Sequence, residues 1–206
     1  MIYKAINNNI DLALKLILSG EIIVYPTDTI YGFGVDATNQ KAIQKLNRLK
    51  KRVSPLSIIV SSYDMIREFV DFKFKASDEI KKYLPGAYTI LLSNNNNILP
   101  KEIGLDTGKI GVRIPNSKFI IKLVEKINKP IITTSVNIHN SHSLNDIDSI
   151  YNNFSSINIF SKDLNICPAN STAALLTDSR PRPMSVSLRA RLPTLSARWN
   201  TSLMST

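Results

Sequence analysis

The sequence predicts a single α/β domain built around a mixed sheet. Short runs of β-branched and aromatic residues interleave with segments whose apolar residues recur at helical spacing, without a strict strand–helix–strand repeat. The chain has 206 residues, of which 43% are hydrophobic and 20% charged, and this suits one domain with a sizeable core. The apolar runs, such as residues 22–25, are too short to span a bilayer.

In the first half of the chain, the elements follow from periodicity and breakers. Residues 11–19 are a predicted helix because Leu12, Leu16 and Ile17 are among its apolar positions, and Gly20 ends it. The same reasoning predicts, in order, a strand at 21–25, a turn-rich loop at 26–34, a helix at 39–49, a strand at 55–61 and helices at 63–69 and 77–83.

The second half continues the alternation. Residues 118–127 are a predicted helix because Phe119, Ile120, Leu123 and Val124 form one apolar face. The other predicted elements are strands at 88–93, 110–114 and 130–134, an exposed loop at 94–97, a helix at 144–153 and a last strand at 171–176.

The composition changes near the C-terminus. Residues 169–206 contain five arginines, no lysine and one acidic residue, Asp178, whereas the preceding part is rich in Lys, Ile and Asn. The run Arg180-Pro181-Arg182-Pro183 resists both a helix and a central strand. We therefore expect a domain at 1–178 and an atypical tail at 179–206 that is loosely ordered and contributes little to the core.

The few cysteine and histidine residues limit the metal sites and disulfides that the chain could form. Cys167 is the only cysteine, so an internal disulfide and a cysteine-rich metal site are excluded. His139 and His142 lack further ligands nearby and are expected in a surface loop. Without a secretory signal or a membrane span, the chain is expected in the cytoplasm.

The formal net charge of +10 favours polyanionic partners such as nucleotides, RNA or anionic lipid, or else lysines that only solvate the surface. Two polar segments follow predicted strands or helices. The hydroxyls and glycines of 26–34 allow close approach of a polar ligand, although a self-capped turn explains them equally well. Lys50-Lys51-Arg52 fits either a triphosphate clamp or a basic cap at a helix C-terminus.

Two further segments belong to predicted strands. Arg113 points to the opposite face from Val112 and Ile114, where it either binds an amino-acid carboxylate or lies on a solvated face. Ser135 and Asn137 occupy alternating positions and can face one cavity, or can mark the end of a strand.

Taken together, these segments resemble the YrdC family of threonylcarbamoyl-AMP synthases, in its short form. The resemblance covers roughly residues 13–172, and its motifs are specific because of their order and spacing. They are the strand and loop 20–34 with Pro26-Thr27-Asp28-Thr29-Ile30-Tyr31-Gly32, then Lys50-Lys51-Arg52, Pro55-Leu56-Ser57, Leu84-Pro85-Gly86-Ala87-Tyr88-Thr89, Gly111-Val112-Arg113-Ile114-Pro115 and Thr134-Ser135-Val136-Asn137.

The resemblance implies a twisted α/β sheet around a basic concave cavity and a nucleotidyltransferase. Such an enzyme forms threonylcarbamoyl-AMP and pyrophosphate from L-threonine, bicarbonate and ATP, for tRNA modification by a downstream threonylcarbamoyl transferase complex. It implies catalytic roles for Lys50, Arg52, Ser135 and Asn137; threonine contacts from Thr29, Tyr31, Arg113 and Ser135; and ATP contacts from Lys50, Arg52, Asn137 and Ser171. Mg²⁺ is expected to arrive with ATP, and no tightly bound cofactor is expected.

Two features of the sequence keep alternatives open. The segment after Asn170-Ser171-Thr172 lacks the family's usual acidic partner and its Arg-x-Gly ending. Arg182 is the better candidate for the missing arginine, because it lies nearest the expected distance beyond Ser171-Thr172. The main alternative is a non-catalytic protein of the same fold that binds double-stranded RNA or tRNA. A carbamoyl-transfer module like that of hydrogenase maturation factors normally lies in a longer chain with additional cysteines.

Overall fold

A computed structural model describes residues 1–51, 55–70, 80–93, 98–104, 107–138 and 141–162. The chain divides into two compact units, Met1–Ala169 and Asn170–Thr206, and every described residue belongs to the first. The predicted division at 178/179 and the predicted strand at 171–176 lie outside the described residues, so they stay predictions. In the part that is described, no helix combines the length and the apolar character needed to cross a membrane.

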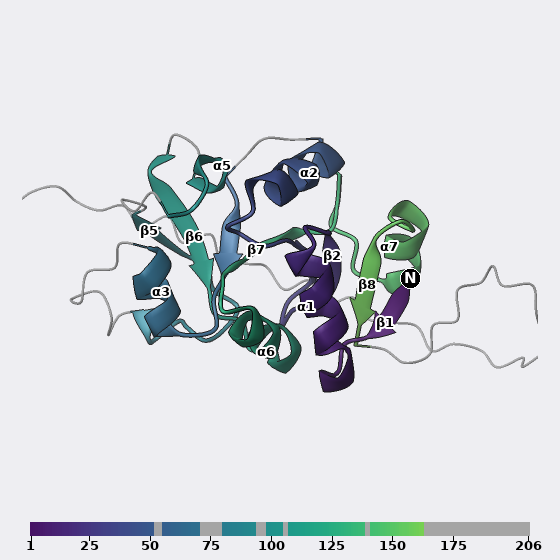
Figure 1. Cartoon of the computed structure of the whole chain (residues 1–206), viewed down its shortest axis with the longest axis horizontal. Helices are drawn as coiled ribbons and strands as arrows, with labels where there is room; N and C mark the ends of the chain where they lie inside the picture. The colour runs from purple at the N-terminus through teal and green to yellow at the C-terminus, as the bar shows by residue number, and fades with distance from the viewer. Residues whose placement is uncertain (52–54, 71–79, 94–97, 105–106, 139–140, 163–206) are drawn as a thin grey trace, which may run out of the picture. The chain divides into compact units, whose positions relative to one another are not determined.

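The described part contains an eight-stranded mixed sheet in the order β1-β8-β2-β3-β7-β4-β6-β5 (Figure 1). Its strands are β1 (Ile2–Lys4), β2 (Ile23–Pro26), β3 (Tyr31–Gly34), β4 (Ser57–Ile59), β5 (Ile90–Ser93), β6 (Lys109–Arg113), β7 (Ile131–Ser135) and β8 (Asn158–Ser161). The pairs β1·β8, β2·β8 and β4·β6 are parallel, and the other four pairs are antiparallel. The predicted α/β domain with a mixed sheet is therefore confirmed.

The helices of the described residues agree with the apolar periodicity. They are a 3-10 turn at Asn7–Asn9 and α1 (Ile10–Leu18), α2 (Gln40–Lys50), α3 (Tyr63–Phe69), α5 (Lys101–Gly104), α6 (Lys118–Ile127) and α7 (Ile147–Asn153). Helix α2 begins where Asn39 Oδ1 accepts a hydrogen bond from Ala42 N at 3.1 Å. It ends at Lys50, because the next residue, Lys51, has a left-handed φ of 52° that cannot continue the helix.

Several predicted boundaries are wrong, for local reasons. The loop predicted at 26–34 contains β3. The two glycines of Tyr31–Gly34 lower the local strand propensity, and for that reason no strand was predicted. Pairing with β2 and β7 nevertheless stabilises a strand there. The helix predicted at 144–153 starts at Ile147, since Asp146 caps it through Ser149 N. Of the helix predicted at 77–83, residues 77–79 lie outside the description and 81–83 form turns. The strands β1 and β8 were not predicted; β1 lies at the edge of the sheet, and β8 lies between β1 and β2.

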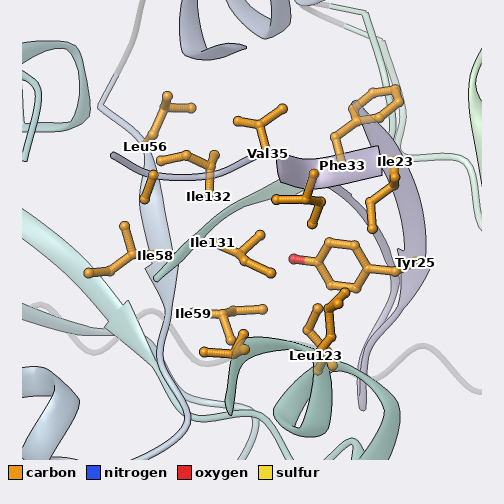
Figure 2. Close-up of a cluster of buried hydrophobic side chains, with 14 of the residues drawn as sticks. Ile23, Tyr25, Phe33, Val35, Leu56, Ile58, Ile59, Leu123, Ile131 and Ile132 are labelled. Atoms are coloured by element: carbon orange, nitrogen blue, oxygen red, sulfur yellow. The ribbon is translucent and has the colours of Figure 1, made fainter. Parts of the chain in front are cut away.

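Helices cover both faces of the sheet. Helices α1 and α6 pack side by side (Figure 1), and Leu123 of α6 lies against Tyr25 and Ile59 (Figure 2). Phe33 points to the opposite face, where its ring meets Phe154, just after α7, edge-on at 5.0 Å between centroids. The sheet is therefore the middle layer, with buried apolar side chains packed on both of its faces.

Gly34 is a tight position in the core beneath α6. A Cβ at this residue would stand 2.5 Å from Tyr25 Cε1 and 3.2 Å from Ile131 Cγ2. We expect Gly34→Ala to destabilise the protein by about 1–3 kcal/mol through overpacking, despite the smaller entropy of the unfolded chain. Urea unfolding measures this as a lower midpoint, and an unchanged midpoint would show that the ring of Tyr25 moves aside without cost.

Candidate functional site

A buried lysine joins the end of α2 to the end of β7. The side chain of Lys50 is 1% exposed, and its Nζ donates to Ser135 O at 2.5 Å and to Asn137 Oδ1 at 2.6 Å. The same ammonium group lies 5.6 Å from the centroid of the Phe33 ring, which adds a cation–π contact. The helix end thus places one positive charge at the carboxyl end of β7.

Ser135 and Asn137 complete this arrangement, which we call the lysine junction (Lys50, Ser135 and Asn137). Ser135 Oγ donates to Asn137 Oδ1 at 2.9 Å, and Asn137 Nδ2 donates to Ser141 O at 2.7 Å. Asn137 Oδ1 accordingly accepts two hydrogen bonds, which fixes the orientation of its amide. The structure therefore brings together three of the four predicted catalytic residues; Arg52 lies outside the described residues, as does the predicted ATP contact Ser171.

A second polar group surrounds Arg113 at the end of β6. The side chain is 12% exposed; its Nη2 forms an ion pair with Asp28 Oδ1 at 2.5 Å, and its Nη1 donates to Thr29 Oγ1 at 3.1 Å. The Nε donates to Gly86 O at 3.3 Å. Within the described part of the chain, three of the five guanidinium N–H donors have partners. The position is a partly buried ion pair and not a solvated face.

The turn that joins β2 to β3 is held by its own hydroxyls. Thr27 Oγ1 donates to Ile30 O at 2.6 Å and accepts from Thr29 N at 3.0 Å. Asp28 Oδ2 accepts from Asn116 N at 3.0 Å, so the turn is also anchored to the segment after β6. The turn is thus self-capped and several of its residues line a pocket, while the approach of a polar ligand stays a prediction.

That pocket has a volume of about 260 Å³ and is lined by Pro26, Thr27, Thr29, Ile30, Tyr31, Asn145 and Lys162. It contains two of the predicted threonine contacts, Thr29 and Tyr31. The Tyr31 hydroxyl lies 3.3 Å from Ser161 Oγ and accepts from Lys162 N at 3.3 Å, while Lys162 Nζ donates to Thr27 O. Tyr31 is thus tied to the end of β8.

The face of the sheet that carries Ser135 also presents further hydroxyls. Register pairs Gly32 with Ser135 and Ser57 with Thr133, so these four residues share one face, and the three hydroxyl side chains are half-buried. Gly111 pairs with Ser57, and a Cβ there would overlap the Ser57 hydroxyl. The small residues on β3 and β6 therefore give space to the ring of Tyr25 and to the hydroxyl of Ser57 on the face that carries Ser135.

Sequence reasoning missed three polar residues of this region. Asp28 stood within the quoted loop, but its partner Arg113 is 85 residues away and no local pattern links them. Thr133 stood beside Ser135 without an assigned role, although the alternation of side chains in a strand places both on one face. Lys162 follows a strand that was not predicted. Among the described residues, no group of three or more His, Cys, Asp or Glu side chains is arranged to hold a metal ion.

Comparison with known proteins decides the family. The model of the Sua5/YciO/YrdC family, described as "Telomere recombination", matches residues 15–185. The chain belongs to this family. The resemblance found in its motifs is thereby confirmed, and the match includes the lysine junction, Arg113 and the turn at 27–30.

Individual relatives agree with this assignment. A protein of Methanocaldococcus jannaschii is 37% identical over 138 residues, which are 66% of this chain and 64% of that one, just under two thirds of its length. A Vibrio campbellii protein named threonylcarbamoyl-AMP synthase is 30% identical over 135 residues, 63% of this chain and 72% of that one.

Solved structures of family members share the fold. The crystal structure of Pyrococcus abyssi Sua5 complexed with L-threonine has a TM-score of 0.72 at 24% identity, and the likeness covers 78% of this chain and 49% of that one. That of E. coli YciO has a TM-score of 0.70 at 20% identity, over 78% and 82% of the two chains.

Proposed function

We propose that this protein is a threonylcarbamoyl-AMP synthase, which makes threonylcarbamoyl-AMP and pyrophosphate from L-threonine, bicarbonate and ATP. The observation that carries the proposal is the lysine junction, in which a buried ammonium group is held beside Ser135 and Asn137 at the end of a strand. The names of the relatives support the same activity.

The reaction needs positioning more than acid–base chemistry. The threonine amine and bicarbonate give a carbamate and water; a carbamate oxygen then attacks the α-phosphorus of ATP. The bond from that phosphorus to the bridging oxygen of the β-phosphate breaks, and pyrophosphate leaves. Since negative charge gathers around the phosphates, a fixed positive charge and aligned hydrogen-bond donors lower the barrier.

The described residues divide these tasks between the two polar groups. Lys50 is assigned to the phosphates, together with Arg52 and Ser171, which lie outside the described residues. Ser135 and Asn137 are assigned to the reacting groups. Arg113 offers guanidinium N–H donors to the threonine carboxylate, beside Thr29 and the pocket that Tyr31 lines. Mg²⁺ is assigned to the phosphates of ATP, and a downstream transferase acting on tRNA is assigned as consumer of the product.

The test is incubation with ATP, L-threonine and bicarbonate, followed by detection of threonylcarbamoyl-AMP and pyrophosphate. We expect the kcat/KM for threonine to exceed that for valine by at least about 100-fold and that for serine by about 10-fold. Valine leaves the groups that bind the threonine hydroxyl without a hydrogen-bond partner, and serine leaves the space of the threonine methyl group empty. Omitting bicarbonate is the control, and pyrophosphate release that needs neither threonine nor bicarbonate would contradict the proposal. A protein that only binds RNA would release none.

A further inference from the structure

A buried tyrosine hydroxyl lies on the same face of the sheet as Thr133 and Ser135 and has no role in the arrangement described so far. Tyr25 in β2 is fully buried, and its hydroxyl faces that of Thr133 without the close, aligned geometry of a full hydrogen bond. Figure 2 shows its ring lying in the core with the hydroxyl directed from β2 toward β7, near Ile131. Buried polar groups are normally well paired, so a hydroxyl held only loosely by its neighbour in this place calls for an explanation.

The glycines of β3 bring this hydroxyl close to Thr133. A Cβ on Gly32 would stand 3.6 Å from Tyr25 Cζ and 3.3 Å from Thr133 Oγ1, so both groups converge above the same glycine. The Thr133 hydroxyl and the charge of Arg113 act to lower the pKa of Tyr25, but burial outweighs them and raises that pKa well above its usual value. Tyr25 therefore stays protonated, and its hydroxyl can donate a hydrogen bond to an acceptor.

Thr133 links this buried donor to the open side of the sheet. It is half-buried, lies on the same face as Ser135 and Ser57, and belongs to β7, the strand that also carries Ser135, with β4 between β7 and the strand of Arg113. A threonine hydroxyl that accepts from a fixed donor beside it must turn its own proton away from that donor. That proton is then available to an acceptor oxygen of a ligand.

We propose that Thr133 donates a hydrogen bond from its hydroxyl to an oxyanion oxygen of the substrates, and that Tyr25 is a positioning residue that orients Thr133 from the core. The distance between the two hydroxyls shortens to a hydrogen bond when the ligand binds, as happens with many catalytic contacts that are loose in the free protein. The inference rests on the proposed function. The oxyanion belongs to the threonine carboxylate, to the bicarbonate-derived carbamate or to a phosphate of ATP, and the kinetics distinguish these.

The experiment uses Tyr25→Phe, Thr133→Val, Thr133→Ser and the double variant of the first two, each of nearly conserved shape. We expect Tyr25→Phe and Thr133→Val each to lower kcat/KM about 5- to 20-fold, with the KM rising for the substrate whose oxygen is bound, whereas Thr133→Ser stays within about 3-fold of wild type. Because Tyr25 acts through Thr133, the double variant should be no worse than Thr133→Val alone.

The controls separate this role from simple packing. Tyr3→Phe, at a tyrosine whose exposed hydroxyl donates to Met1 Sδ at 3.3 Å, should leave the kinetics unchanged. If Tyr25 served the core alone, Tyr25→Phe would match or exceed the wild-type melting temperature with unchanged kcat and KM, and that result would overturn the proposal. Multiplicative losses in the double variant would overturn the action through Thr133.

Failure of the proposed function is visible separately, since the wild-type protein would then form no product. In that case the same variants are compared for binding of L-threonine and of ATP by calorimetry. Weaker binding by both single variants, without an added loss in the double variant, supports the inference, and wild-type binding by both contradicts it.

Discussion

Lys50→Met is expected to lower kcat/KM by about 100- to 1,000-fold, the loss typical of removing one preorganised charged group from an active site. Methionine keeps most of the volume of the lysine stem in its buried position beneath the Phe33 ring, so the protein should still fold. The ammonium charge at the end of β7 is lost, and with it the hydrogen bonds to Ser135 O and Asn137 Oδ1. Steady-state pyrophosphate release measures the effect.

Lys45→Met is the matched control, because it lies on the same helix. The side chain of Lys45 is 45% exposed and pairs with Glu21 at 2.6 Å, so its removal should change stability by less than about 0.5 kcal/mol and activity by less than 2-fold. If Lys50→Met kept more than about a third of the wild-type activity while folded, the lysine junction would be a structural feature only.

The parts of this fold that were predictable from sequence are those in which local pattern and tertiary packing agree. Helix α6 has its predicted bounds because Phe119, Ile120, Leu123 and Val124 all face the core. The proximity of Ser135 and Asn137 was also predictable, since alternating residues of an extended segment share one side. In these cases, the spacing of residues along the chain already determines the geometry.

The parts that were not predictable depend on residues far apart in sequence. Strand β3 contains Gly32 and Gly34, which argue against a strand until the ring of Tyr25 is seen to occupy the space above them. Arg113 carried two open interpretations because its partner Asp28 comes from a turn 85 residues earlier. Likewise, the convergence of Tyr25 and Thr133 follows from the pairing of β2, β3 and β7, and no motif records it.

Arg113→Ala is expected to have the second large effect, acting on both stability and threonine use. The ion pair with Asp28 is partly buried, the two side chains being 12% and 13% exposed, so its loss leaves a poorly solvated carboxylate and costs about 1–3 kcal/mol, less than for a fully buried pair. Threonine KM should rise at least about 10-fold because the charge-assisted donors to its carboxylate are absent. Urea unfolding and threonine saturation curves measure the two effects.

Arg113→Lys separates the structural contribution from the contact with substrate. A lysine restores a positive charge near Asp28 but not the planar fork that reaches Asp28, Thr29 and a ligand together, so we expect most of the stability to return while threonine KM stays high. Arg67→Ala is the control, since that arginine pairs with Asp64 on the surface of α3 and should change neither quantity measurably. If Arg113→Lys recovered stability and threonine KM to the same degree, Arg113 would serve only to hold the turn at 27–30 against β6, and the carboxylate would have to be bound by other residues.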